Sequence, residues 1–439
     1  MITLQLNQSY TCDAQHAPSI SPILMKAAKD CLNEGMFHFY DGCLRRCITD
    51  TVILPLSHYQ DLEELVYGKI FPVIVMFAIV SNMTVAVVLS KKHMITSTNL
   101  VLKYMAVAEL LVGLIPLPWT LFFFTMKHYE HNEDLELWWC YLNKYSMDAL
   151  PPIFHNIAMW LTVLLAAQRY VSISYPMYSR SICNLRNVRI ATLVITAVSF
   201  GCGLPKSFDY YLDVVDSWVL SGFFPDFRYT RACTSKATPF LLFVGPTLFY
   251  NIYFWTRTIF FITLPSILLV ILNILLIRQL RLAELRKIRL LKEKRSEEAA
   301  RQRDINSTSY MLVFIVSLFL IVNLPQAAFM GVLCVCETFH IRVALLDGIF
   351  PAVFLLSSNM LVMATYPINF GIYCFMSSSF RQTFEDIFVP TWFIHFRNAM
   401  QTERTATRSV MEERNEATEH LMLSDVPSAR YYAKRASVY

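Results

Sequence analysis

Long uncharged blocks separated by short polar stretches dominate this chain. A helix that crosses a bilayer core about 30 Å thick needs about 20 apolar residues, because each residue rises about 1.5 Å. Seven blocks reach this length or come close to it: residues 70–90, 104–126, 151–167, 190–205, 258–277, 307–336 and 348–380. The pattern predicts an all-α membrane protein, a seven-transmembrane helix bundle.

A further uncharged block, residues 237–256, is separated from the fifth block by Arg257 alone. Two adjacent spans need a turn between them, and one residue is too short to reverse the chain. We therefore interpret residues 237–255, which include Pro239 and Pro246, as an extracellular loop that folds onto the helix ends. An eighth span is the alternative interpretation.

Charged residues in the short connections predict the orientation, because lysine and arginine collect on the cytoplasmic side. The first, third and fifth connections are basic, with Lys91, Lys92, Arg180, Arg186, Arg189 and a run from Arg278 to Arg303. The second connection is acidic, with Glu130, Glu133, Asp134 and Glu136. We expect a multi-pass plasma-membrane protein with an extracellular segment (residues 1–65), a seven-helix domain that ends in an amphipathic helix (66–388) and a cytoplasmic, disordered tail (389–439).

Composition narrows the function classes. The 439 residues are 55% hydrophobic and only 16% charged, whereas soluble domains carry about 25% charged residues. The net charge of +5 comes from residues beside apolar blocks rather than from a basic domain, so we expect no nucleic-acid partner. The spans contain no paired acids, Ser/His pair or metal-ligand cluster, so we predict no enzyme, no catalytic residue, no metal and no cofactor.

Cysteines on the extracellular side can form disulfides in that oxidising compartment. The amino-terminal segment contains Cys12, Cys31, Cys43 and Cys47, which allow two disulfides in three connectivities or free thiols. Cys140 and Cys233 allow one bridge from the start of the third span to the second extracellular loop. Asn7 begins the sequence Asn-Gln-Ser, which predicts a glycosylation site.

The most specific motif lies in the third span, where Ala167-Gln168-Arg169-Tyr170-Val171 follows Trp160-Leu161-Thr162. With Asn323-Leu324-Pro325 and Tyr366-Pro367-Ile368-Asn369-Phe370, this pattern resembles the rhodopsin-like G protein-coupled receptors. In particular, it is similar to the invertebrate sex-peptide and myoinhibitory-peptide receptor group. The resemblance covers residues 66–388 and implies a receptor for an extracellular neuropeptide.

The resemblance also implies an activation switch, formed by Asn82, Glu109, Gln168, Arg169, Tyr170, Phe319, Asn323, Pro325, Pro367, Asn369 and Phe370. Gln168, Asn323 and Phe370 depart from the family pattern of an acid, a tryptophan and a tyrosine. Because Gln168 cannot form the ion pair that restrains the arginine, we expect high basal activity. Glu109 replaces the usual aspartate, which leaves a sodium site or a water and proton network as alternatives.

Physical arguments single out some of the same residues. A charge inside a membrane costs several kcal/mol without a partner or water, so Arg169 and Glu109 are functional candidates. Arg169 can instead anchor the helix at the membrane surface. Pro325 and Pro367 each remove a backbone donor and provide a place for the helix to bend, although static kinks are the alternative.

Two residues argue against an amine or retinal as the ligand. Pro151 stands where amine receptors have an acid, and Met360 stands where opsins have the lysine that attaches retinal. Aromatic residues in the second loop favour a peptide with aromatic and basic residues, together with the acids near helix ends, Asp209, Asp213, Asp216, Glu337 and Asp347. The candidate ligand-binding residues are Trp119, His155, Trp218, Glu337 and Asp347. An interfacial aromatic belt or core packing is the alternative for the aromatic residues.

On the cytoplasmic side, a basic amphipathic extension of the fifth helix predicts contact with a heterotrimeric G protein or anionic lipid. Residues 380–388 predict an amphipathic helix on the membrane surface, and serines and threonines in the tail predict phosphorylation and arrestin binding. A rhodopsin-like receptor with a non-peptide ligand or none is one alternative function. A secondary transporter is another, but the spans show no internal repeat.

Overall fold

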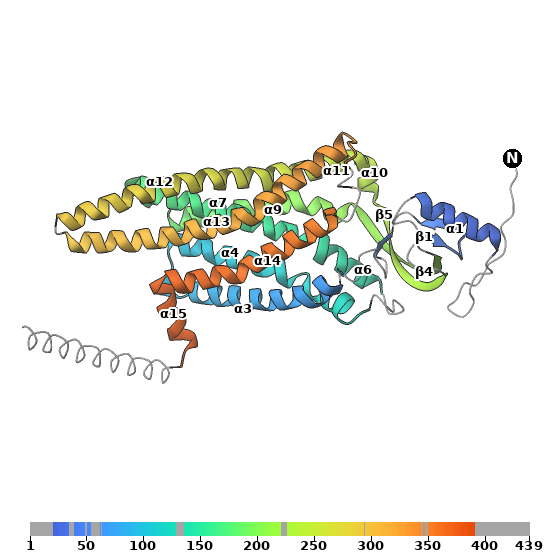
Figure 1. Cartoon of the computed structure of the whole chain (residues 1–439), viewed down its shortest axis with the longest axis horizontal. Coiled ribbons are helices and arrows are strands. Elements are labelled where there is room, and N and C mark those ends of the chain that lie inside the picture. Colours follow the sequence, from blue (N-terminus) through green and yellow to red (C-terminus); the bar gives the residue numbers. More distant parts are fainter. Residues whose placement is uncertain are drawn as a thin grey trace, which may run out of the picture. The chain divides into compact units, whose positions relative to one another are not determined.

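The computed structural model describes residues 21–34, 39–48, 51–53, 62, 64–128, 136–220, 226–293, 295–343, 346 and 350–390. The chain divides into two compact units, Met1–Ser377 and Ser378–Tyr439. The first contains the membrane helices and a β-sheet (Figure 1). Asn7, Asp347 and the predicted tail beyond residue 390 lie outside the described residues.

Seven helices in the described part of the chain are long and apolar enough to cross a membrane. They are Glu64–Leu89, Ser97–Thr125, Leu137–Ser174, Leu185–Phe208, Pro246–Lys292, Ser309–Thr338 and Phe350–Phe375. Each contains one of the seven apolar blocks or most of it. The predicted seven-helix membrane bundle is therefore confirmed.

Most spans join an α-helix to a π- or 3-10-helical segment, marked η. The first span is η1 (Glu64–Ile70) and α3 (Phe71–Leu89), the second is α4 (Ser97–Leu114), α5 (Leu117–Thr120) and η3 (Leu121–Thr125), and the third is α6 (Leu137–Asn143), η5 (Lys144–Ala149) and α7 (Leu150–Ser174). The fourth is α9 (Leu185–Gly203) and η6 (Leu204–Phe208), the fifth is α11 (Pro246–Thr256), η7 (Arg257–Thr263) and α12 (Leu264–Lys292), and α13 (Ser296–Thr338) and α14 (Phe350–Met376) follow. The short helices η2 (Lys92–Met94) and α8 (Pro176–Ile182) lie in connections.

Local sequence signals fix where two spans begin. The Thr96 side chain accepts a hydrogen bond from the Asn99 backbone N–H at 3.1 Å, and the Asn184 side chain accepts one from Asn187 at 2.8 Å. Such N-caps satisfy backbone donors that the first helical turn leaves unpaired. They start α4 and α9 where polar connections meet apolar blocks.

Helix α7 lies at the centre of the bundle and contacts α4, α9, α12 and α13. A glycine allows its close approach to α9, because a Cβ atom at Gly203 would lie 2.4 Å from Cγ1 of Ile153. Small residues commonly permit such contacts between membrane helices. The third span is consequently the structural axis to which four other spans attach.

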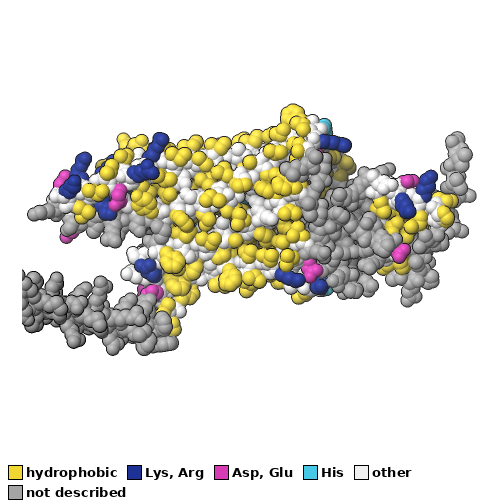
Figure 2. Space-filling view, in the orientation of Figure 1, with side chains coloured by type: hydrophobic (Ala, Val, Ile, Leu, Met, Phe, Trp, Pro, Cys, Tyr) yellow, Lys and Arg dark blue, Asp and Glu magenta, His cyan; other side chains and the backbone are white. Residues whose placement is uncertain are grey.

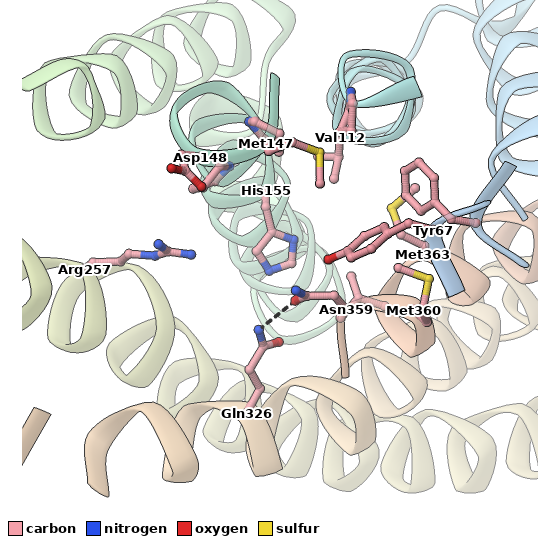
Figure 3. Close-up of a pocket in the computed structure, with 15 residues that line it drawn as sticks. Tyr67, Val112, Met147, Asp148, His155, Arg257, Gln326, Asn359, Met360 and Met363 are labelled. Atoms are coloured by element: carbon pink, nitrogen blue, oxygen red, sulfur yellow. Dashed lines mark hydrogen bonds between the residues drawn. The ribbon is translucent and has the colours of Figure 1, made fainter. Parts of the chain in front are cut away.

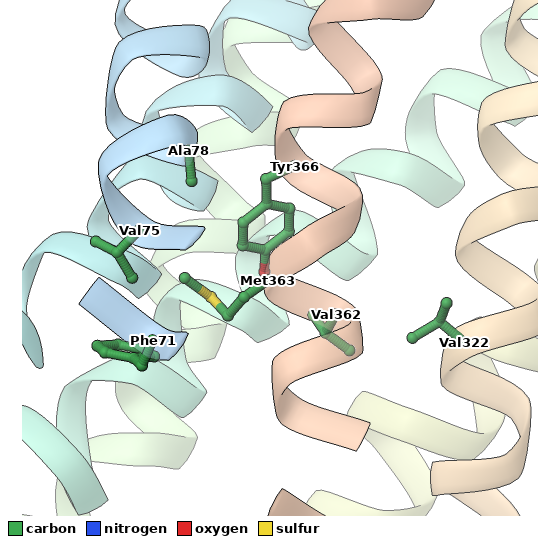
Figure 4. Close-up of a cluster of buried hydrophobic side chains, with 7 residues drawn as sticks. All are labelled: Phe71, Val75, Ala78, Val322, Val362, Met363 and Tyr366. Carbon is green, nitrogen blue, oxygen red and sulfur yellow. The ribbon is translucent and has the colours of Figure 1, made fainter. Parts of the chain in front are cut away.

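A cluster of buried hydrophobic side chains packs the first span against the last two spans (Figure 4). Its members come from the first, sixth and seventh spans: Phe71, Val75, Ala78, Val322, Val362, Met363 and Tyr366. The outer surface is also apolar, and Figure 2 shows hydrophobic side chains over the middle of the bundle with the described charges near its two ends. This distribution fits a helix bundle surrounded by lipid.

The interpretation of residues 237–255 as a loop is wrong. These residues form α10 (Pro239–Val244) and α11, and α11 continues through Arg257 into the fifth span. Pro239 and Pro246 each occupy the first turn of a helix, a position where a missing N–H costs little. Gly245 separates the two helices with φ at +88°, a conformation that favours glycine.

A five-stranded antiparallel sheet, which was not predicted, lies at one end of the bundle, hereafter the sheet end (Figure 1). Its strands are β1 (Phe39–Asp41), β2 (Arg46–Ile48), β3 (Thr51–Ile53), β4 (Tyr210–Leu220) and β5 (Arg228–Ala237), in the order β2-β1-β4-β5-β3. The connection between the fourth and fifth spans thus contains a hairpin of β4 and β5. Strand β1 pairs with β4 at one edge of this hairpin, and β3 pairs with β5 at the other.

The amino-terminal segment is attached to this hairpin by buried contacts. Cys31 of α1 (Pro22–Glu34) forms a disulfide with Cys47, and Cys43 is also disulfide-bonded, while Cys12 lies outside the described residues. The fully buried Asp41 accepts a hydrogen bond from the Ser217 hydroxyl of β4. Residues 21–53 therefore include an ordered part of the sheet end.

In the second unit, α15 (Ser378–Phe388) is a helix, as predicted. Phe384 and Phe388 are one helical turn apart, with ring centroids separated by 5.3 Å. Polar residues such as Arg381 and Glu385 lie between the aromatic positions. The helix is amphipathic.

The two glycines of α9 provide a matched test of its contact with α7. Gly203→Leu should lower the stability of the bundle by about 1–3 kcal/mol, because the added side chain collides with Ile153. Gly201→Leu should have little effect, since a Cβ atom there meets nothing within 4 Å. Thermal unfolding of the purified variants measures both, and equal unfolding temperatures would refute the close-packing argument.

Candidate functional site

A cavity of about 240 Å³ opens inside the helix bundle, and we call it the central cavity (Figure 3). The first, second, third, fifth, sixth and seventh spans contribute its walls. It is lined by Tyr67, Phe71, Val112, Pro116, Met147, Asp148, Pro151, Pro152, His155, Arg257, Gln326, Asn359, Met360, Val362 and Met363. A ligand bound in a cavity with walls from six spans can change the relative positions of those spans.

Irregular helical turns carry three of the polar lining residues. Tyr67 lies in the π-helical η1, Asp148 lies in η5, and Arg257 is the first residue of η7. A π-helical turn contains an extra residue and turns the following side chains to new directions, and such turns are frequent at functional sites. These turns therefore help to place polar side chains around the cavity.

The cavity has a polar half and an apolar half. In Figure 3, Asp148 and Arg257 lie on one side and Tyr67 and Met363 on the other, with His155 between them. Between the sixth and seventh spans, the Gln326 amide donates a hydrogen bond to the Asn359 side-chain oxygen at 3.3 Å. An amphipathic ligand group can therefore be oriented by the two halves.

Tyr210 connects Asp148 to the sheet end. The Tyr210 hydroxyl forms a hydrogen bond with the Asp148 carboxylate. Burial and the nearby carboxylates of Asp148 and Asp209 raise the pKa of Tyr210 well above its usual value, so its hydroxyl stays protonated. The tyrosine therefore remains a donor to Asp148 across the physiological pH range.

A buried ionic cluster centred on Asp209 holds Tyr210 in turn. Asp209 is 0% exposed and Lys144 is 2% exposed, and the Lys144 ammonium lies 3.2 Å from the Asp209 carboxylate. Lys206 pairs with the other carboxylate oxygen at 2.5 Å, and the Tyr250 hydroxyl donates to it at 3.1 Å. The Tyr210 backbone N–H donates to Asp209 at 2.8 Å. This Asp209 cluster joins the third, fourth and fifth spans to β4.

Below the cavity, His155 contacts the predicted switch. The centroid of its ring lies 6.5 Å from that of the Phe319 ring, and the two rings are stacked. Phe319 belongs to a buried cluster of the third, fifth and sixth spans. The Asn323 amide donates to the Phe319 carbonyl at 2.8 Å and also forms a hydrogen bond with His155. Since Pro325 follows within the same turn, the cavity floor adjoins the weakest part of α13.

Farther along the bundle, Asn369 donates a hydrogen bond to the buried Glu109 carboxylate at 3.2 Å. Asn82 and Tyr366 are also buried and each keeps a polar atom without a partner. Within the described residues, no group of three or more metal-ligating side chains is found. Pro367 and Phe370 lie in the same helix as Asn369, and the side chain of Phe370 is half-buried.

At the end opposite the sheet, Arg169 and Gln168 keep buried atoms unpaired, Nε and Oε1 respectively. In the described part of the chain, no acid forms an ion pair with Arg169. The neighbouring Tyr170 packs against a buried cluster that includes Ile173 of its own helix and the fifth-span residue Leu280. The predicted effect of Gln168 on basal activity stays a prediction.

The predicted ligand-binding residues are not brought together. His155 lines the central cavity, but Trp119 is 2% exposed, stacks on Phe123 at 4.7 Å and packs near the disulfide between Cys140 and Cys233. Trp218 contacts Tyr229 across the hairpin. Glu337 is exposed at the end of α13. Trp119, Trp218 and Glu337 lie outside the cavity lining, while the predicted Cys140–Cys233 bridge is present.

Three of the five acids that favoured a basic peptide are already paired; of the other two, Glu337 is exposed and Asp347 lies outside the described residues. Asp209 lies in its buried cluster, Asp213 is bound to Lys236 at 2.9 Å, and Asp216 is bound to Arg231 at 2.5 Å. Hydrogen bonding and the charge of Lys236 lower the pKa of Asp213, so it stays ionised. These carboxylates carry no uncompensated charge for a ligand.

Sequence reasoning missed Asp148 and Arg257, the two charged residues that line the cavity. Arg257 is a lone cation between two uncharged blocks. We interpreted it as the boundary between a loop and a span, and therefore did not predict that it lies inside the bundle. Asp148 lies three residues before Pro151 and had no distinguishing pattern. Only the fold brings the two residues to one cavity.

Comparison with known proteins agrees with this architecture. The model of serpentine-type seven-transmembrane G protein-coupled chemoreceptors of the Srw group matches residues 69–390. The chain is 62% identical to the sex peptide receptor-related protein 2 of Caenorhabditis elegans, over 88% of this chain and 85% of that protein.

Two other relatives are named for peptides. The chain is 33% identical to the sex peptide receptor of Drosophila melanogaster, over 76% of this chain and 74% of that protein. It is 24% identical to the FMRFamide receptor of Drosophila melanogaster, over 78% of this chain and 57% of that protein.

The Asp209 cluster and the exposed pair of Asp216 provide a matched test of buried charge. Asp209→Ala should destabilise the fold by about 3–5 kcal/mol, because it leaves Lys144 buried without a counter-charge. Asp216→Ala removes a surface pair and should cost no more than about 1 kcal/mol. Thermal unfolding of the two variants measures the difference, and similar midpoints would contradict a structural role for the cluster.

Proposed function

Because this chain belongs to the serpentine seven-transmembrane G protein-coupled receptors, we propose that an extracellular neuropeptide activates it by binding in the central cavity. The bound receptor then activates a heterotrimeric G protein at the opposite end of the bundle. The observation that carries this proposal is the position of the cavity. It lies between the sheet end and the switch residues, with walls from six spans whose rearrangement transmits the signal.

The size of the cavity favours one end of a peptide as its occupant. Its volume of about 240 Å³ is below the range of about 300–1,000 Å³ that is usual for drug-sized ligands. A peptide can place one or two residues inside and leave the rest over the sheet. The sex peptide and FMRFamide receptors are relatives named for peptides, which also supports this ligand class.

Two features support a sheet end that faces the outside of the cell. The disulfides Cys31–Cys47 and Cys140–Cys233 belong to this end, and disulfides persist in the oxidising extracellular space. The other end carries the basic extension of α12, including Arg278, Arg281 and Arg286, as the cytoplasmic side of a membrane protein does. The amino terminus is then extracellular and the carboxyl terminus cytoplasmic.

Signal transmission starts at the floor of the cavity. A peptide that contacts His155 changes its packing against Phe319 and its hydrogen bond with Asn323. Pro325 weakens α13 next to these residues, so the helix has a place to bend. The peptide acts by preferring the state in which the sixth helix has moved outward.

The cytoplasmic contacts follow from the exposed surfaces. Leu285, Ile288 and Leu291 are exposed on α12 among basic residues, which suits a G protein or anionic lipid. The amphipathic α15 suits the membrane surface. Phosphorylation of the serine- and threonine-containing tail adds the negative charge that arrestin binds.

A panel of invertebrate neuropeptides, including sex peptide and FMRFamide, tests the proposed function in cells that express the full chain. At least one peptide should produce a dose-dependent G protein response, and Arg169→Ala should abolish it. Surface labelling of both forms controls for expression. Silence across the panel from a surface-expressed receptor would contradict the peptide class.

Signalling without a peptide tests the role of Gln168. Gln168→Asp should lower ligand-free G protein activity several-fold, because the new carboxylate can pair with Arg169 and restrain it. Gln168→Asn is the matched control, since it shortens the side chain to the same length without adding charge. Unchanged basal activity in the aspartate variant would reject this explanation.

A further inference from the structure

The polar half of the central cavity contains a cation that forms no ion pair with the described residues. The Arg257 Nε is buried and has no hydrogen-bond partner, and among the described residues no acid forms an ion pair with this guanidinium. A charge removed from water is costly unless it is paired or hydrogen-bonded. A bound ligand group can supply that partner.

Asp148, the other charged residue of the cavity, is already matched. The Tyr210 hydroxyl hydrogen-bonds with its carboxylate, and Lys206 adds a further positive charge nearby. Arg257 also influences Asp148 electrostatically, but the two do not form a salt bridge. The group left to be satisfied in this half is therefore the guanidinium.

The surroundings of Arg257 keep it directed into the cavity. It begins the π-helical η7, and together with Tyr253, Phe261 and Pro152 it lines a second, smaller hollow beside the main one. The bulky side chains that line this hollow with Arg257 restrict where its own side chain can go. In Figure 3 its guanidinium extends toward His155 at the centre of the cavity.

The apolar half faces this cation. Met147, Met360 and Met363 line it together with Val112 and the ring of Tyr67. Methionine is flexible and polarizable, adapts to irregular shapes and makes favourable contacts with aromatic rings. This half suits an apolar or aromatic side chain.

We infer that Arg257 binds an oxygen acceptor of the peptide, a carboxylate or a carbonyl group, while the methionine half holds an apolar or aromatic side chain next to it. This inference rests on the proposed function and specifies the chemistry of that same site. It also reverses the sign of the ligand charge expected from the acids near the helix ends. Three of those acids, Asp209, Asp213 and Asp216, are paired, whereas Arg257 forms no ion pair with an acid among the described residues.

The charge of the cavity can be measured without any peptide. Met360→Cys places a thiol in the lining, and two methanethiosulfonate reagents of similar size, one anionic (ethylsulfonate) and one cationic (ethyltrimethylammonium), report the local potential through their reaction rates. Mass spectrometry of the purified full chain follows the labelling. The chain without the introduced cysteine gives the background from native thiols such as Cys202 and Cys336.

We expect the anionic reagent to react faster in the Met360→Cys receptor, after correction for its rate with a free thiol. Adding Arg257→Gln should lower the ratio of anionic to cationic rates roughly tenfold, because a positive charge that lines the same cavity then disappears. Adding Arg257→Lys should keep most of the ratio, which also controls for folding. A ratio that changes less than twofold with Arg257→Gln, or a faster cationic reagent in the parent, would overturn the inference.

A peptide arm identifies the acceptor. For each panel peptide that activates the unaltered receptor, Arg257→Gln should reduce potency at least tenfold at equal surface expression, and Arg257→Lys should reduce it less. Analogues with Asp and Glu replaced by Asn and Gln separate the sources. A potency loss in the unaltered receptor that is absent in Arg257→Gln indicates a side-chain carboxylate, and no loss indicates a carbonyl or terminal oxygen.

The two proposals fail differently. Unchanged potency in Arg257→Gln for every activating peptide would overturn the acceptor role while leaving the receptor function intact. An inactive peptide panel would refute the peptide class, but the thiol rates would still measure the potential that Arg257 creates.

Discussion

A charge that leaves water for the interior of a membrane protein must find a partner, and this constraint organises the molecule from the sheet end to the opposite end. Asp209 satisfies it fully, with contacts from Lys144, Lys206, Tyr210 and Tyr250. Those contacts join three spans to the hairpin. Arg257 and Arg169 each keep a buried Nε atom unpaired, and they lie in the central cavity and at the end opposite the sheet, respectively.

The contrast between paired and unpaired charges separates structure from function in this chain. The Asp209 cluster fixes Tyr210, and Tyr210 holds Asp148 at the cavity wall. The cavity thereby receives a shaped polar half before any ligand arrives. His155 lines the cavity and contacts Phe319 and Asn323, next to the proline that weakens α13. The contacts of His155 with Phe319 and Asn323 are direct, so the proposed peptide site adjoins the sixth helix.

Hydropathy predicted most of the fold because the bilayer imposes a simple length rule on each span. It failed at residues 237–255, since an apolar helix that extends past a single arginine has the same composition as an apolar loop. The sheet was missed for another reason. Its amino-terminal strands span three residues each and depend on pairing with the hairpin, so their own sequence contains little signal.

The site was less predictable than the fold. The motif around Arg169 was recognisable because its residues are adjacent in sequence, and Cys140 and Cys233 were predicted from the side of the membrane on which they lie. The cavity combines residues from distant spans, so Asp148, Gln326 and Asn359 had no shared pattern. Individual charges also misled, because Asp213 and Asp216 attract attention in the sequence but are neutralised by Lys236 and Arg231 in the hairpin.

The most direct test of this account is an experimental structure of the full chain bound to an activating peptide and a G protein. We predict that one end of the peptide occupies the central cavity, with an oxygen within hydrogen-bonding distance of Arg257 and a side chain against Met360 and Met363. The sixth helix should bend near Pro325. A peptide held only on the β4–β5 hairpin, above an empty cavity, would contradict the account.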